Sequence, residues 1–184
     1  MSLDLSRLLR DGIEALEEAG LAHAVMGGCA RNAYAEPRAT KDVDFVAEVE
    51  AQKHPKLLRA LARRGFSVAT SVGGHEPVPD LTLFRDAAGR RLDVLFAHTD
   101  FERSALERSG PGEPYAGLVV AVVTPEDLVV YKVLADRPQD RADIQAVVRA
   151  VEARGGAIDW AYVERWCDAW EVRGRLDRLR EEWS

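Results

Sequence analysis

The chain has 184 residues, of which 47% are hydrophobic, enough for one core with a small helical part appended. Its formal net charge of −6 excludes broad, sequence-independent binding to phosphate backbones, although a local basic patch is still compatible with it. No apolar run is long enough for a membrane span, and acids interrupt the N-terminal segment where a secretory signal would be apolar. Without a span or a signal, we expect a cytoplasmic protein with no membrane partner. Cys29 and Cys167 are too few for a disulfide framework or a zinc site, so we expect both thiols to be reduced.

Hydrophobic periodicity predicts alternating helices and strands over the first two thirds of the chain. We expect an amphipathic helix over 5–20, a strand over 23–28, one or two helical turns over 29–35, a strand over 42–49, a helix over 54–65, and strands over 66–71, 81–86 and 90–96. Residues 101–117 are expected to be irregular or a short helix, and 118–123 to form one more strand.

From Thr124 onward the pattern predicts only helices, about three of them, with Thr124 as the first N-cap and Pro125 in the first turn. The aromatic residues of this tail recur at helical spacing, which favours core packing over a base-stacking platform. We therefore expect an α+β fold. It would have a mixed β-sheet core over 1–123 and C-terminal helices over 124–184 packed on that core.

Asp42 and Asp44 lie on one face of the strand predicted over 42–49, because side chains alternate along a strand. Val43 and Phe45 take the other face and pack inward. Two carboxylates this close repel each other, and a hard cation that prefers oxygen ligands relieves the repulsion. The pair indicates a Mg²⁺ or Mn²⁺ site. The ordinary alternative is a D-x-D pair on a solvated strand end.

Asp93 lies in the middle of the strand predicted over 90–96, where an ionised carboxylate needs compensation. Either an arginine or a metal supplies it. With Asp42 and Asp44 on an adjacent strand, Asp93 would complete a three-carboxylate cluster of the kind that holds two Mg²⁺ ions for in-line phosphoryl displacement. The candidate arginine partners are Arg85, Arg90 and Arg91.

The order Gly27-Gly28, Asp42-Val43-Asp44 and then Asp93 on a later strand resembles the nucleotidyltransferase superfamily typified by DNA polymerase β. That family's pattern is a glycine followed by Ser or Gly at a strand end, a short helix, paired aspartates and a third acid one or two strands on. The resemblance covers residues 22–96. It departs at Gly28, where many members have Ser, which leaves only backbone N–H groups to bind a phosphate there.

The segment R-x-T-K-D-x-D, which contains Arg38, Thr40 and Lys41, further resembles the minimal enzymes of this superfamily. These include antibiotic nucleotidyltransferases and the abortive-infection type of toxin nucleotidyltransferase. Arg38 or Lys41 would neutralise triphosphate charge, or each would be a solvated loop residue.

The resemblance implies a mixed sheet flanked by helices and a reaction that transfers a nucleoside monophosphate from an NTP to an acceptor hydroxyl, with pyrophosphate leaving. It implies that the turn at Gly27 and Gly28 holds the NTP. Asp42, Asp44 and Asp93 would be the catalytic residues and the ligands of Mg²⁺ or Mn²⁺, and Asp93 would also accept the proton of the nucleophile.

Lys132 is the one charged residue in the otherwise apolar run 128–135, which predicts a helix packed on all sides. Its ammonium group either reaches water or projects into the cleft toward phosphate. The pattern of Lys132, Asp140 and Asp143 resembles late motifs of the toxin-type enzymes, which implies that Lys132 and Asp143 serve the nucleotide site. Asp140 fits helix-start electrostatics.

Three functions are compatible with these residues. The first is transfer of a nucleoside monophosphate to a small-molecule hydroxyl, the second a toxin-type or regulatory modification of an RNA end or a protein, and the third an inactive nucleotide-binding module. Retention of all three acids weighs against the third, and the acidic net charge favours the first over RNA. The four histidines show no ligand spacing, so the sequence assigns them no role.

Overall fold

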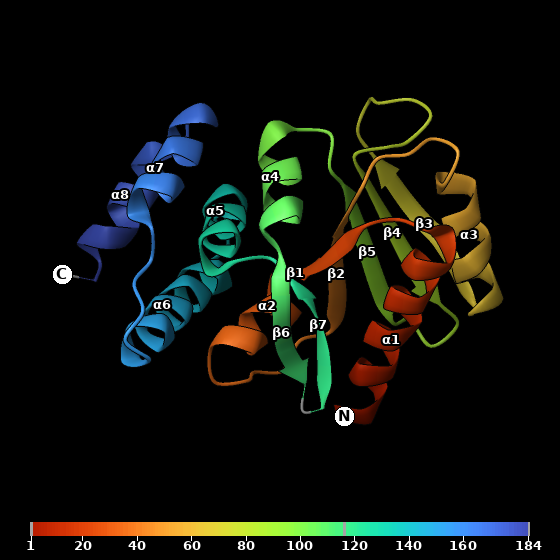
Figure 1. Cartoon of the computed structure of the whole chain (residues 1–184), viewed down its shortest axis with the longest axis horizontal. Helices are drawn as coiled ribbons and strands as arrows, with labels where there is room; N and C mark the ends of the chain where they lie inside the picture. The colour runs from red at the N-terminus through yellow and green to blue at the C-terminus, as the bar shows by residue number, and fades with distance from the viewer. Residues whose placement is uncertain (1, 116, 184) are drawn as a thin grey trace.

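The structure is a computed structural model that describes residues 2–115 and 117–183. Within those ranges the chain forms eight helices and one seven-stranded sheet (Figure 1). The elements are α1 (Ser2–Ala19), β1 (His23–Met26), α2 (Gly27–Tyr34), β2 (Asp42–Ala47), α3 (His54–Arg63), β3 (Phe66–Val72), β4 (Leu81–Asp86), β5 (Arg91–Phe96), α4 (Asp100–Arg108), β6 (Gly110–Tyr115), β7 (Leu118–Val122), α5 (Pro125–Ala135), α6 (Pro138–Ala153), α7 (Trp160–Ala169) and α8 (Arg173–Glu181).

The sheet is mixed, with strand order β3-β4-β5-β2-β1-β7-β6. The central strands β2 and β5 run parallel, β1 is antiparallel to β2 and parallel to β7, and the outer pairs are antiparallel. This architecture confirms the α+β expectation. It also places the two strands that carry the aspartates side by side.

The two faces of β2 differ in chemistry. Val43 and Phe45 are fully buried on one face, as predicted. Helix α1 packs so closely there that a Cβ atom added to Gly12 would lie 2.5 Å from the Phe45 ring. Asp42 and Asp44 alternate with these residues and so take the opposite face. The candidate site therefore forms on the face of the sheet that α1 does not cover.

Residues 101–117 differ from expectation. The helix α4 is present, but residues 110–115 form strand β6, which the sequence did not predict. Pro111 and Pro114 argue against a strand in the sequence, since proline lacks the N–H that a central strand needs. β6 pairs only with β7 at the edge of the sheet, where proline is tolerated.

Four helices follow Thr124, rather than about three. The break between α7 and α8 contains Glu171, whose φ of 56° interrupts the helical path. Thr124 caps α5 as predicted, accepting the Asp127 N–H at 3.3 Å. α5 and α6 both contact α2, which brings the C-terminal helices to the candidate site (Figure 1). The division at residue 123 stays a prediction.

None of the helices in the described part of the chain is both long and apolar enough to cross a membrane.

Candidate active site

The three predicted aspartates meet on the polar face of the central strands. The parallel register of β2 and β5 sets Asp44 directly beside Asp93, and Asp42 beside Arg91. One ligand oxygen from each of Asp42, Asp44 and Asp93 lies within 4.8 Å of the others. The short-range alternation of each strand and the pairing of the two strands together produce this cluster.

Crowding and burial shape the electrostatics of the cluster. Burial, together with the charges of Asp42 and Asp93, raises the pKa of Asp44 to about 7. Burial also raises the pKa of Asp93, against the opposing effect of Arg91. A cation bound beside Asp44 and Asp93 would favour their ionised forms.

Arg91 supplies part of that positive charge. Its guanidinium group pairs with Asp42, and its Nε atom lies 3.2 Å from Oδ2 of Asp93. The arginine contact expected for Asp93 is therefore present. Its other oxygen, Oδ1, is buried and has no hydrogen-bond partner among the described residues, and the metal contact stays a prediction. A buried oxygen without a partner, in a set of three carboxylates, fits a divalent cation with oxygen ligands.

The glycine turn lies at the start of α2, beside the aspartates. Gly27 has a φ of +63°, and a Cβ atom there would lie 2.1 Å from the Asp44 carboxylate, so only glycine fits. A Cβ atom on Gly28 would lie 2.7 Å from Oγ1 of Thr40. The departure from Ser at Gly28 therefore has a local cause, the close approach of Thr40. The N-terminus of a helix presents free backbone N–H groups and favours anions.

A pocket of about 570 Å³ joins these parts. Its polar wall includes Gly27, Gly28, Lys41 and the three aspartates, and its apolar wall comes from strands β4 and β5 and helix α5. The volume falls within the range of pockets that hold small-molecule ligands.

Residues of the loop before β2 have different surroundings: some make hydrogen bonds or ion pairs with acids of the protein, and Lys41 is exposed. Oγ1 of Thr40 donates to Oδ1 of Asp42 at 3.1 Å, which orients that carboxylate. Arg38 is turned away from it and makes a bidentate contact with Asp143 at 2.7 and 2.6 Å. Lys41 lines the pocket, and its exposed side chain makes no ion pair with the rest of the described chain. Lys41 is thus the better placed of the two cations to meet a triphosphate.

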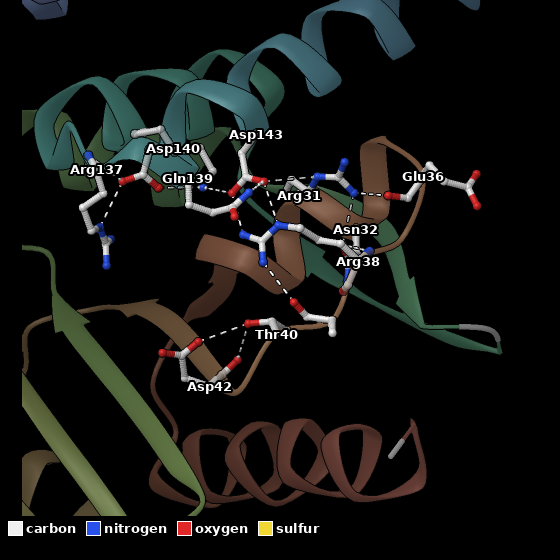
Figure 2. A network of polar contacts seen from close by, with 12 residues as sticks. Arg31, Asn32, Glu36, Arg38, Thr40, Asp42, Arg137, Gln139, Asp140 and Asp143 are labelled. Carbon is white, nitrogen blue, oxygen red and sulfur yellow. Dashed lines mark hydrogen bonds and ion pairs between the residues drawn. The ribbon is translucent and has the colours of Figure 1, made fainter.

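Lys132 does not reach water, contrary to one of the two expectations for it. The residue is only 6% exposed, and its ammonium donates to Asp140 at 3.0 Å and to Asp143 at 2.7 Å. Figure 2 shows these acids on helix α6 with Arg38 and Arg137 reaching toward them. Asp140 also accepts the backbone N–H of Arg137 at 3.2 Å, which is the predicted helix-start role.

This network joins α2, the loop before β2, α5 and α6 behind the pocket. Burial opposes ionisation of Asp143, but hydrogen bonds from Arg38 and Lys132 outweigh it and lower the pKa of Asp143 to about 2. Asp143 does not line the pocket, whereas Lys132 and Asp140 do. A direct role of Lys132 or Asp143 with nucleotide stays a prediction. The observed partners of Lys132 are Asp140 and Asp143, and Asp143 also pairs with Arg31 and Arg38 and accepts a hydrogen bond from Gln139.

Among the pocket residues that sequence reasoning missed, three have hydrogen-bonding side chains: Tyr131, Arg137 and Gln139. Arg137 is mostly exposed and adds positive charge that opposes the raised pKa of Asp44. Its only sequence signal is a cation directly before the Pro138 that opens α6, a position that brings it near the site only once α6 packs on α2.

Comparison with solved structures identifies the fold. The solution structure of the antibiotic-resistance factor ANT(2'')-Ia matches with a TM-score of 0.64 at 16% sequence identity, over 100% of both chains. A crystal structure of ANT(2'')-Ia in complex with adenylyl-2''-tobramycin matches with a TM-score of 0.57 at 19% identity, over 97% of this chain and 98% of that one. The lincomycin-bound lincosamide antibiotic adenylyltransferase LnuA matches with a TM-score of 0.56 at 15% identity, over 77% and 94%.

No protein-family model matches the sequence, and no curated protein does. The chain has a nucleotidyltransferase fold, as the sequence pattern predicted. Antibiotic nucleotidyltransferases are among its structural neighbours.

Proposed function

We propose that the chain is a metal-dependent nucleotidyltransferase that transfers a nucleoside monophosphate from an NTP to a hydroxyl group of a small-molecule acceptor. The observation that carries this proposal is the pocket in which Asp42, Asp44 and Asp93 lie beside the helix N-terminus at Gly27 and Gly28. Carboxylates and free backbone N–H groups in one pocket suit a ligand with both metal-bound and free phosphate oxygens.

In this reaction the backbone N–H groups at Gly27 and Gly28 bind phosphate oxygens of the NTP, and Lys41 adds positive charge at the pocket wall. Asp42, Asp44 and Asp93 would hold Mg²⁺ or Mn²⁺, which when bound stabilises the charge on the reacting phosphoryl group. Thr40 keeps the Asp42 carboxylate oriented through its hydrogen bond.

The acceptor hydroxyl oxygen forms the new bond to the α-phosphorus, and the bond from that phosphorus to pyrophosphate breaks. Asp93 accepts the hydroxyl proton, for which its unpartnered Oδ1 atom is suited. The main contribution of the protein is to hold the acceptor hydroxyl, the α-phosphate and Asp93 close together in one pocket.

A small molecule is the acceptor class that the comparisons favour. One neighbour is in complex with adenylyl-2''-tobramycin, and another is a lincosamide antibiotic adenylyltransferase with lincomycin bound. Both cover most of this chain, including α5 and α6 in the case of ANT(2'')-Ia. ATP is therefore the first donor to test, and aminoglycosides and lincosamides are the first acceptors.

The test incubates the full chain with Mg²⁺, each α-³²P-labelled NTP, and a panel of aminoglycosides, lincosamides, total RNA and a protein extract. We expect label in a small-molecule product and release of pyrophosphate, both lost in Asp93→Asn. Label found only in RNA or protein would show that the acceptor is not a small molecule. No label with any donor would contradict the proposed transferase activity.

A further inference from the structure

A second group of metal-ligand side chains lies outside the pocket. His75 and Asp80 come from the loop between β3 and β4, and His98 comes from the segment after β5. One ligand atom from each lies within 4.8 Å of the others. Residue spacing does not indicate this group, because 17 residues and strands β4 and β5 separate Asp80 from His98 in the chain.

The ligand atoms of the three side chains lie close to one another. Nδ1 of His75 contacts Oδ1 of Asp80, and Nε2 of His98 lies 3.9 Å from the same oxygen. The two imidazole rings stack with centroids 4.3 Å apart. Ligand atoms about 2.0–2.1 Å from a tetrahedral metal are about 3.4 Å from one another. The observed separations are close to these values. Because the two ring planes are only 11° apart, one imidazole must rotate about its side-chain torsions before both nitrogens point at the ion.

The backbone holds this arrangement in place. The Asp80 carbonyl accepts the Phe96 N–H at 2.8 Å, which ties the loop to the end of β5. A Cβ atom on Gly73 would lie 2.2 Å from the Asp80 carboxylate, so the loop closes against that group where only glycine fits. His98 is largely buried, with a side chain 14% exposed, whereas His75 is 61% exposed. One ligand is thus anchored in the protein and another faces water.

We propose that His75, Asp80 and His98 form a site for a borderline transition-metal ion of the Zn²⁺ class, separate from the aspartate cluster. Imidazole nitrogen suits Zn²⁺, Co²⁺ and Ni²⁺, whereas Mg²⁺ prefers an all-oxygen set such as the three aspartates. Two neutral imidazoles and one carboxylate leave a fourth position for water on the exposed side.

Metal binding at His98 replaces a hydrogen bond. Its Nε2 atom lies 3.1 Å from the Val78 carbonyl and 3.3 Å from the Pro79 carbonyl, which can accept only from a protonated nitrogen. An ion takes the place of that proton, so the carbonyl contacts lower the affinity without blocking the site.

The bound ion would fasten the loop over residues 73–80 to the end of β5. Leu81 follows this loop directly and pairs with Leu95, and both residues line the pocket. The ion would therefore stabilise one wall of the pocket from outside it. Binding to the folded state alone raises the melting temperature.

The test is calorimetric titration of the chelator-stripped full chain with Zn²⁺ in a large excess of Mg²⁺, which competes with Zn²⁺ for the aspartates. We expect one Zn²⁺ per chain and a rise in melting temperature. His75→Ala should weaken binding at least about tenfold, the effect of losing one of three protein ligands. Because His75 is mostly exposed, this variant should keep the metal-free melting temperature of the wild type.

Two control variants separate this site from the rest of the protein. Asp93→Asn should bind Zn²⁺ as the wild type does, and so should His23→Gln, which alters a histidine outside the cluster. With Co²⁺, the visible absorption of a histidine-bound ion should appear in the wild type and in Asp93→Asn and be absent from His75→Ala. Equal Zn²⁺ affinity in His75→Ala and the wild type, or loss of the binding in Asp93→Asn, would overturn the proposal.

Discussion

Nε of Arg91 lies 3.2 Å from Oδ2 of Asp93, and the same guanidinium group pairs with Asp42. Arg91 and Asp93 share the polar face of β5 because they are two residues apart. The arginine is thus a permanent positive charge at the place where the proposed metal ions would also be attracted. It stabilises the carboxylates when no metal is bound and competes with an ion that approaches Asp42.

Arg91→Met should lower the stability of the metal-free protein and increase its stabilisation by a metal ion. Without the guanidinium group, the three carboxylates repel one another in a buried setting, so the metal-free melting temperature should fall by several degrees. Mn²⁺ should then restore more stability in the variant than it adds to the wild type. Thermal melts with and without Mn²⁺ measure both changes. An identical Mn²⁺ response in the two proteins would show that Arg91 does not compete with the ion.

Gly28→Ser tests the close contact with Thr40. The added side chain must enter space within 2.7 Å of the Thr40 hydroxyl, so we expect a loss of about 1–3 kcal/mol in the free energy of unfolding. Thr40→Ala in the same chain removes the hydroxyl and should recover most of that loss. A double-mutant cycle in urea measures the coupling. Independent, additive effects of the two substitutions would contradict the packing explanation.

Lys132→Met removes the cation between two buried acids, Asp140 and Asp143. We expect a loss of about 1–3 kcal/mol in the free energy of unfolding, since the two acids lose charged hydrogen bonds while Arg38 and Arg137 remain paired with them. Lys41→Met is the matched control, because that lysine is exposed and pairs with no acid in the described structure. It should leave stability within about 0.5 kcal/mol of the wild type and weaken ATP binding. Equal stability of the two variants would contradict the network's structural role.

The lowered pKa of Asp143 predicts that the free energy of unfolding decreases at acidic pH. Its folded-state pKa of about 2 is below its ordinary value, so the carboxylate adds stability above about pH 4, and this is lost as the pH falls toward 2. The difference in unfolding free energy between wild type and Asp143→Asn should therefore shrink over that interval. Urea titrations at several pH values measure it. A difference that stays constant from pH 5 to pH 2 would show that Asp143 is not held ionised by Arg38 and Lys132.

The cluster of Asp42, Asp44 and Asp93 was predictable because two local rules suffice: alternation fixes the face of each strand, and a known order of motifs suggests which strands are neighbours. The position of Gly28 was also visible, but its reason was not, since the Thr40 contact depends on the path of a loop. Strand β6 was hidden by its prolines.

Contacts between distant segments explain the remaining differences. The contact of Arg38 with Asp143 could not be predicted, because the two residues are 105 positions apart and meet only when α6 packs on α2; Arg38 also lines the pocket, and its role with triphosphate stays a prediction. The pairing of His75 with His98 has the same origin, because neither residue has a ligand spacing in the sequence. Local periodicity carries no information about such contacts, which tertiary packing alone determines.

The measurement that tests the central claim most directly is the melting temperature of wild type and Asp93→Asn with ATP, with Mg²⁺, and with both. Arg91 keeps its pairing with Asp42 in the variant, so the fold should be retained without ligands. We predict that ATP and Mg²⁺ together raise the melting temperature of the wild type, that neither does so alone to the same extent, and that the variant shows no such rise. Failure of ATP, GTP, CTP and UTP to stabilise the wild type with Mg²⁺ or Mn²⁺, or an equal response of Asp93→Asn, would contradict the account.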